Sequence, residues 1–468
     1  MKEDIKKEDI KKDKNAQQSL PPAREAALSV LYDIEANGAW SNLALRQRLA
    51  EGDYSSADCG FITELVYGVT RMKGSCDYLL ELFLNTPTDK LALHILLILR
   101  MGIYQLRYLG GVRPAAAVDE AVKLAKKYGH RGTAALVNAV LRNYLRGADE
   151  IKFPDREKEP VKFLSAYYSY PRWLAGYFIK LWGIDGAEQF CAFANRPKKT
   201  DIRVNTLQTD AASLAAELKA AGIDTAAGKY APEALTLLTG ADMEKLSPFA
   251  DGLFTVQDEV SMLASLVLAP MPDSRVIDMC AAPGGKTTHL AQLCQNRGEI
   301  RAFDIHEHKI PLINAACARM RIDIVQSEAR DSSSLAEDYR EWADYLLLDA
   351  PCTGLGVLSR RADARWNKKY EDIAELAAVS RELLSAAAAC LKRGGVMVFS
   401  TCTVTKEENE DNLQWFLNTH TDFCLESIDS LLPLFTDEDC DDLRRGYIQL
   451  LPQRHGLDGF FIARLRKA

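Results

Sequence analysis

The chain has 468 residues, of which 47% are hydrophobic and 26% charged, and its net charge at neutral pH is -7. This length exceeds what one hydrophobic core usually serves, so we expect several domains with the composition of a globular protein. No apolar run is long enough to span a membrane, no secretory signal is visible, and the 11 cysteines contain no C-x-x-C pair. We therefore expect a cytoplasmic protein without a disulfide framework or a metal site.

The first part of the chain is predicted to be helical. Residues 1–20 mix both charge signs with few apolar residues, which predicts a disordered tail. Over residues 21–150, apolar residues recur every three or four positions and Gly or Pro separates the segments, which predicts an all-α domain. The most apolar stretch, residues 91–106, is interrupted by His94 and Arg100 and is typical of a buried helix.

The rest of the chain combines strands with helices. Residues 151–256 contain aromatic-rich helices and short strand candidates, and they predict a small α+β connecting domain. Over residues 257–468 strands and helices alternate, which predicts an α/β, Rossmann-like sheet with ligands at the carboxyl ends of its strands. The expected strands of that sheet are residues 275–279, 299–305, 323–328, 343–350, 395–402 and 459–465.

A loop of small residues follows the first of these strands. The loop, Cys-Ala-Ala-Pro-Gly-Gly-Lys, ends at Lys286, where a helix is expected to begin. Gly284 and Gly285 permit a tight turn and a close approach of the backbone to a ligand. Asp304 ends the next strand, at a position where Rossmann sheets use a carboxylate to bind ribose hydroxyls. The pattern favours an adenosine cofactor without a phosphate on the ribose.

Two later strands end at cysteines. Cys352 follows the strand that ends in Asp349, and Cys402 follows another apolar strand. Carbon 5 of cytosine is a poor nucleophile, but a thiolate that adds to carbon 6 enables carbon 5 to attack a methyl donor. The reaction needs a cysteine with a lowered pKa and an acidic group at the pyrimidine edge. Asp349 suits the acidic role, and the second cysteine could resolve the covalent adduct.

Three motifs in this order resemble those of the RNA cytosine-C5 methyltransferases, specifically the bacterial ribosomal RNA branch known as RsmB, Sun or Fmu. They are D-x-C-A-A-P-G-G-K from Asp278, D-A-P-C-T-G from Asp349 and S-T-C-T-V from Ser400. The helical part, above all residues 98–129 and 136–145, resembles the NusB family of RNA-binding antitermination factors. Together the resemblances cover nearly the whole chain and imply a NusB-like domain joined to a Rossmann-like methyltransferase domain that depends on S-adenosylmethionine.

The resemblance also implies roles for individual residues. Cys402 would be the nucleophile and Cys352 would assist release of the product, with Asp349 and Lys286 completing the catalytic set. Glu328 occupies the place of an acidic residue, usually Asp, that follows the third strand in the family. The implied cofactor-binding residues are Cys280, Ala281, Ala282, Pro283, Gly284, Gly285, Lys286, Asp304, Glu328 and Asp349.

By the same resemblance, the partner is small-subunit ribosomal RNA, in which one cytosine is methylated. The basic residues between Lys123 and Arg146 then form a candidate RNA surface, despite the acidic total. A second basic cluster, residues 360–369, stands where the family has an R-x-x-P-D-like stretch, and this chain departs from it with Arg360-Arg361-Ala362-Asp363. We expect a monomer that binds neither a membrane nor a metal.

Other functions remain open at this point. A transfer RNA cytosine-C5 methyltransferase would share the chemistry, and a non-catalytic NusB-like RNA-binding protein would use only the helical domain. A DNA cytosine methyltransferase would use the cysteine of the Pro-Cys motif as its nucleophile, which leaves Cys402 without a role. A P-loop ATPase is suggested by Gly285-Lys286-Thr287, but Cys280 stands where that motif needs a glycine.

Overall fold

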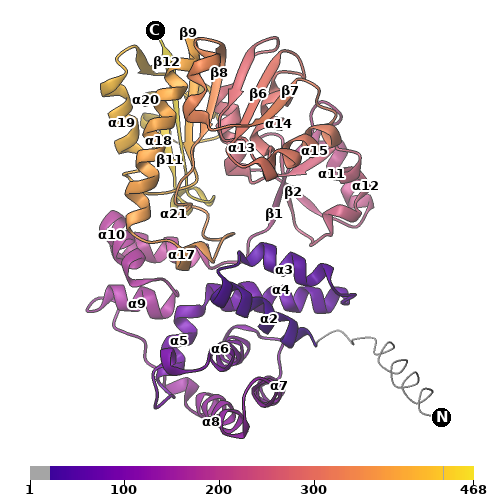
Figure 1. Ribbon diagram of the computed structural model, residues 1–468, viewed down its shortest axis with the longest axis vertical. Coiled ribbons are helices and arrows are strands. Elements are labelled where there is room, and N and C mark those ends of the chain that lie inside the picture. Colours follow the sequence, from indigo (N-terminus) through magenta and orange to yellow (C-terminus); the bar gives the residue numbers. More distant parts are fainter. Residues whose placement is uncertain (1–21, 436) are drawn as a thin grey trace, which may run out of the picture. The chain divides into compact units, whose positions relative to one another are not determined.

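The computed structural model describes residues 22–435 and 437–468, so the tail expected over residues 1–20 lies outside the described residues. The chain divides into two compact units, one ending at Cys191 and the other beginning at Ala192 (Figure 1). The expected fold class is confirmed, because a helical unit precedes a small α+β part and a larger α/β sheet.

Helix α6 (Leu93–Tyr108) is the central helix of the first unit, as its apolar sequence predicted. Its side chains are buried without interruption from Ile95 to Gln105. The Nε atom of Arg100 lies 2.7 Å from Oδ1 of Asp77, so the buried charge is paired. The other helices of this unit are α2 (Ala23–Asn37), α3 (Ser41–Ala50), α4 (Ser56–Arg71), α5 (Lys73–Glu81), η1 (Thr88–Lys90), α7 (Pro114–Tyr128), α8 (Arg131–Gly147), η2 (Ala148–Glu150) and α9 (Pro160–Tyr167).

Helix α10 (Arg172–Ala194) leads into the second unit and is broken at Gly183, where φ is +67°. A small antiparallel sheet follows, in the order β2-β3-β1-β4. Its strands and helices are β1 (Thr200–Val204), α11 (Ala211–Ala220), β2 (Thr225–Ala227), β3 (Ala234–Leu237), η3 (Met243–Lys245), α12 (Ser247–Ala250) and β4 (Phe254–Val256).

The larger sheet has the order β10-β12-β9-β8-β5-β6-β7, and β11 pairs with β12. Its neighbours from β9 to β7 run parallel, whereas β10, β11 and β12 pair antiparallel. The strands are β5 (Arg275–Asp278), β6 (Glu299–Asp304), β7 (Val325–Ala329), β8 (Ala343–Asp349), β9 (Leu391–Thr401), β10 (Phe423–Leu425), β11 (Tyr447–Leu450) and β12 (Phe460–Lys467).

Helices cover both faces of this sheet (Figure 1). Successive side chains of a strand point to opposite faces, so an apolar strand contributes to a core on each face. Val276 of β5 joins a core with α13 (Glu259–Leu268), α14 (Gly285–Leu293) and α15 (Ile310–Met320), whereas Ile277 joins one with α18 (Glu371–Cys390) and α19 (Glu410–Thr419). The remaining short helices are η4 (Glu307–Lys309), η5 (Ser332–Ser334), α16 (Ala336–Tyr339), α17 (Ala364–Asn367), η6 (Asp429–Leu431), η7 (Asp437–Asp439), α20 (Cys440–Arg445) and α21 (Pro452–His455).

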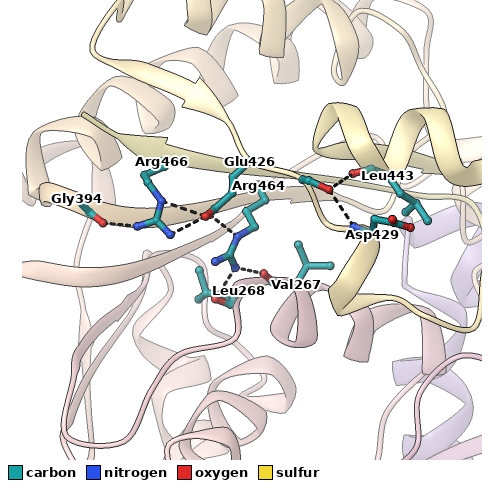
Figure 2. A network of polar contacts seen from close by, with 9 residues as sticks. Val267, Leu268, Gly394, Glu426, Asp429, Leu443, Arg464 and Arg466 are labelled. Carbon is teal, nitrogen blue, oxygen red and sulfur yellow. Dashed lines mark hydrogen bonds and ion pairs between the residues drawn. The ribbon is translucent and has the colours of Figure 1, made fainter.

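A polar network anchors the last strand to helix α13 (Figure 2). Glu426 accepts hydrogen bonds of 2.7 Å from both Arg464 and Arg466 of β12. Arg464 also donates to the main-chain oxygens of Val267 and Leu268, the last residues of α13. Carbonyls in the last turn of a helix have no partner within the helix, so Arg464 satisfies them in the interior. The network fixes β12 to the end of α13. The first residue of β12, Phe460, lines the cavity described in the next subsection.

Candidate active site

The parallel strands bring four loops to one edge of the sheet. Strands β5, β6, β8 and β9 end at Asp278, Asp304, Asp349 and Thr401, and their carboxyl ends face the same way. The loop after β5 and the two cysteine loops after β8 and β9 therefore meet. The loops thus lie together at the carboxyl ends of the strands, where the sequence analysis expected a ligand site.

The loop after β5 turns sharply into α14, as its glycines predicted. Gly284 has φ +102°, and a Cβ there would lie 3.1 Å from the Cα of Ile313, so both backbone and packing require glycine. Gly285 differs, because a Cβ there would meet only Gln257, at 3.6 Å. Asp278, beneath the loop, accepts a 2.7 Å hydrogen bond from Thr287, and burial raises its pKa to about 7.

The two predicted cysteines lie in contact. Their Sγ atoms are 3.3 Å apart. The hydrogen bond from Cys352 lowers the pKa of Cys402, with the positive charges of Lys286 and Arg361 adding to it against the effect of burial. The same hydrogen bond, burial and the nearby carboxylates raise the pKa of Cys352. Cys402 is therefore the thiol that ionises more readily.

An ion pair lies beside the cysteines. Lys286 Nζ is 2.7 Å from Oδ2 of Asp349 and 3.0 Å from Oγ of Ser261. Burial opposes the charged form of Lys286, but attraction to Asp349 outweighs it and raises the pKa of this amine. Ser400 donates a 2.8 Å hydrogen bond to Oδ1 of Asp349. Because its amine is already paired, Lys286 is unlike a lysine kept free for nucleotide phosphates.

A cavity of about 310 Å³ opens on these groups. Eight of the predicted site residues line it: Cys280, Ala281, Ala282, Pro283, Gly285, Lys286, Asp349 and Cys402. Four others do not: Gly284, Asp304, Glu328 and Cys352. The cavity therefore joins the loop after β5 to one of the two cysteines.

Asp304 and Glu328 lie at neighbouring strand ends. The Asp304 carboxylate accepts hydrogen bonds from the main-chain N–H groups of Ala282, at 3.3 Å, and His306, at 3.0 Å. It thus sits against the loop after β5, where the sequence expected it. Glu328 lies within β7, as in the strand expected over residues 323–328, and it is exposed.

Sequence reasoning gave no role to Glu408, which follows Cys402 by six residues. This buried carboxylate accepts hydrogen bonds from Thr353 N at 2.7 Å, Thr353 Oγ1 at 2.6 Å and Thr405 Oγ1 at 2.6 Å. Burial raises its pKa. Glu408 therefore ties the loop that follows Cys352 to the loop that follows Cys402. Its spacing of three from Thr405, a capping-box pattern, was the available signal.

Sequence reasoning also gave no role to Arg203. It is fully buried and donates hydrogen bonds to the main-chain oxygen of Gly285 at 2.7 Å and to Oγ1 of Thr288 at 2.9 Å. Burial lowers its pKa to about 9. Arg203 belongs to β1, so it connects the small sheet to the end of the loop after β5 and to the start of α14.

Over the residues that the structure describes, no helix is both long and apolar enough to cross a membrane. Within the same residues, no group of three or more His, Cys, Asp or Glu side chains is placed to hold a metal ion.

Three family descriptions match successive parts of the chain. "NusB family" matches residues 21–146, "Methyltr_RsmF/B-like, ferredoxin-like domain" matches residues 170–244, and "16S rRNA methyltransferase RsmB/F" matches residues 265–466.

Curated relatives match along almost their whole length. A protein of Bacillus subtilis (strain 168), named probable ribosomal RNA small subunit methyltransferase B, is 37% identical over 446 residues, which are 95% of this chain and 98% of the relative. The ribosomal RNA small subunit methyltransferase B of Vibrio cholerae is 31% identical over 95% of this chain and 97% of its own.

Two solved structures are also similar. The crystal structure of PH0851 has a TM-score of 0.79 at 29% identity and covers 96% of this chain and 99% of its own. NSun6 from Pyrococcus horikoshii, solved with SFG, has a TM-score of 0.57 at 27% identity and covers 64% of this chain and 98% of its own.

Proposed function

The chain belongs to the 16S rRNA methyltransferase RsmB/F family, and we propose that it transfers a methyl group from S-adenosylmethionine to carbon 5 of one cytosine in small-subunit ribosomal RNA. One observation carries the proposal. Two cysteine sulfurs lie 3.3 Å apart, beside a partly buried Lys–Asp pair, at the edge of the sheet that also carries the loop after β5.

Cys402 is the nucleophile in this proposal. Its lowered pKa favours the thiolate, which adds to carbon 6 of the cytosine and forms an S–C6 bond. Carbon 5 then carries the electron density that attacks the methyl group. After methyl transfer a base takes the proton from carbon 5, the S–C6 bond breaks, and Cys402 regains its electron pair. Cys352, 3.3 Å away, assists this release.

Asp349 and Lys286 hold the pyrimidine edge. The Asp349 carboxylate can accept a hydrogen bond from the exocyclic amine of the base. Lys286, 2.7 Å from that carboxylate, puts a positive charge beside the ring nitrogen where negative charge grows as the thiolate adds. Ser400 keeps the carboxylate in place through its 2.8 Å hydrogen bond. These residues bind and orient the base, and they stabilise the adduct.

The cofactor-binding residues in this proposal are those of the loop from Cys280 to Lys286, with Asp304, Glu328 and Asp349. Their chemistry fits S-adenosylmethionine, because carboxylates at strand ends accept hydrogen bonds from ribose hydroxyls and would repel a ribose phosphate. When bound, this cofactor supplies an electrophilic methyl group on a sulfonium. Asp349 belongs to both residue sets because it bonds to Lys286 of the loop and lines the same cavity as Cys402.

The helical domain supplies the substrate class. We propose residues 21–150 as an RNA-binding domain, 151–256 as the connecting domain and 257–468 as the methyltransferase domain. The match of residues 21–146 to the NusB family supports this division. Ribosomal RNA as the substrate implies that the protein acts in the cytoplasm, and we expect it to act as a monomer.

Methyl transfer from labelled S-adenosylmethionine tests the proposal. Unmodified small-subunit ribosomal RNA, transfer RNA and duplex DNA are offered separately, and any product is mapped by bisulfite sequencing. We expect a single protected cytosine in the ribosomal RNA. If only transfer RNA is labelled, the chemistry stands and the substrate class is wrong.

A non-catalytic RNA-binding protein is the second candidate. It predicts that Cys402→Ser keeps full biological activity, for example rescue of a deletion strain. Retention of that activity with no methyl transfer to any RNA would replace the proposed enzyme with this alternative.

A further inference from the structure

The cavity at the active site is lined by three basic side chains that differ in what they contact. Lys286 is paired with Asp349 at 2.7 Å, whereas Arg360 and Arg361 follow the Cys352 loop. A basic side chain can bind a substrate anion strongly only where its own charge is not already used. The partners of the two arginines therefore decide which of them is available.

Arg360 is held by three carboxylates from separate parts of the chain. Its Nη2 atom lies 2.7 Å from Asp258 and 3.0 Å from Asp201, and its Nε atom lies 3.1 Å from Asp458. Lys198 lies 3.4 Å from the same Asp458, so the cluster holds two positive charges for three carboxylates. The charge of Arg360 is therefore already neutralised by carboxylates and is not available to a substrate anion. We assign Arg360 to positioning the segment that follows it.

Arg365, the next arginine of this basic cluster, also has a partner within the protein. It is fully buried, and its Nη1 atom donates a 2.9 Å hydrogen bond to Asn195. Its position within α17, away from the cavity lining, fits a structural role. The sequence analysis grouped Arg360, Arg361 and Arg365 in one basic cluster, whereas the structure gives their side chains different surroundings.

Arg361 differs from both. Its side chain is exposed, lines the cavity that contains Cys402, and makes no hydrogen bond or ion pair with any residue in the described part of the chain. Its main chain is nevertheless fixed, because its N–H donates to Val357 O at 3.0 Å and its carbonyl accepts from Ala364 N at 3.0 Å. A free guanidinium on a fixed backbone thus stands at the mouth of the cavity.

We propose that Arg361 binds a backbone phosphate of the target nucleotide and thereby seats the cytosine over Cys402. This inference rests on the proposed function. An enzyme that acts on a base must draw that nucleotide out of its stack, so its phosphate stays at the entrance while the base enters. A guanidinium matches phosphate geometry with paired hydrogen bonds, and single-stranded nucleic acid brings one such charge with each nucleotide.

The test compares full-length Arg361→Ala and Arg361→Lys with wild type. The matched control is Arg340→Ala, which removes an exposed arginine just before β8, at the opposite edge of the sheet. Equilibrium binding of unmodified small-subunit ribosomal RNA is measured between about 50 and 200 mM salt, together with kcat, KM and the affinity for S-adenosylmethionine.

We expect Arg361→Ala to weaken RNA binding about tenfold at low salt and to reduce the salt slope of binding by about one. KM for RNA should rise by a similar factor, and cofactor affinity should stay within about twofold of wild type, a range that also covers the control. Arg361→Lys should keep the salt slope, because the charge remains.

Two results would overturn the assignment. One is RNA binding and a salt slope for Arg361→Ala that equal those of Arg340→Ala. The other is a loss of cofactor affinity with unchanged RNA binding, since the carboxylate of S-adenosylmethionine would then be the partner. RNA binding is measured without methyl transfer. Wild-type enzyme that binds RNA but methylates none would therefore refute the proposed function, while the RNA affinities of Arg361→Ala and Arg340→Ala would still test the role of Arg361.

Discussion

The Sγ atoms of Cys352 and Cys402 lie 3.3 Å apart although 50 residues separate them in the chain. The contact makes the two thiols unequal, since one donates the hydrogen bond that favours ionisation of the other. The lowered pKa of Cys402 supports the proposal that Cys402 is the nucleophile and that Cys352 assists the release step. The proposed mechanism depends on this assignment.

Replacing the nucleophile should stop the reaction. We expect Cys402→Ser to lower methyl transfer at least roughly a thousandfold, because a serine hydroxyl is not ionised near neutral pH and adds poorly to carbon 6. Labelled S-adenosylmethionine and ribosomal RNA measure the loss, and unchanged cofactor binding serves as the control. Substantial residual turnover would mean that another group is the nucleophile.

Replacing the second cysteine should trap the adduct. We expect Cys352→Ala to accumulate enzyme covalently joined to RNA, because the S–C6 bond forms but breaks slowly. The complex is visible as a slowly migrating band on a denaturing gel. A band with Cys402→Ala and none with Cys352→Ala would reverse the two roles.

The ionisation of Cys402 should depend on Cys352. The hydrogen bond from Cys352 stabilises the thiolate and lowers the pKa of Cys402, so its removal in Cys352→Ala should raise that pKa. The midpoint of Cys402 alkylation by iodoacetamide, followed by peptide mass spectrometry, should therefore move to higher pH. Replacing the exposed Cys424 with Ala should leave the midpoint where it is. A midpoint that stays fixed or falls in Cys352→Ala contradicts the prediction.

Ser400 should matter through Asp349. Ser400→Ala removes the 2.8 Å hydrogen bond to Oδ1 of Asp349, and we expect kcat/KM to fall about tenfold, the usual effect of losing one hydrogen bond to a charged group. Ser385→Ala, which removes a serine whose hydroxyl donates to the Arg381 carbonyl in α18, is the control. Equal activity of the two variants would show that Lys286 alone positions Asp349.

Glu408 should be needed for stability. Glu408→Ala leaves the buried N–H of Thr353 and the hydroxyl of Thr405 without an acceptor, and we expect the free energy of unfolding to fall by roughly 3 kcal/mol. Calorimetry would record a lower unfolding temperature for the second unit. Glu375→Ala, at an exposed position of α18, should have almost no effect. A similar small effect in both variants would mean that water replaces the Glu408 carboxylate.

Much of this protein was determined by its sequence alone. The three- and four-residue spacing of apolar residues predicted the buried helix α6, and the alternation of apolar strands with helices predicted strands β5 to β9 and β12 of the larger sheet. Strands β10 and β11 were not predicted. Parallel strands end at one edge, so Asp304, Asp349 and Cys402 could be expected near the cofactor loop before any coordinates were known. These features follow from local periodicity and from the geometry common to all such sheets.

Only the tertiary structure decided which side chains pair. Lys286 and Asp349 are 63 residues apart, and the carboxylates around Arg360 come from three separate segments. Arg360, Arg361 and Arg365 carry the same side chain, yet packing occupies two of them and leaves Arg361 free at the cavity. Which charged side chains are paired depends on the distances between remote segments and on their burial. A charge is neutralised by a partner only where folding brings an opposite charge close to it.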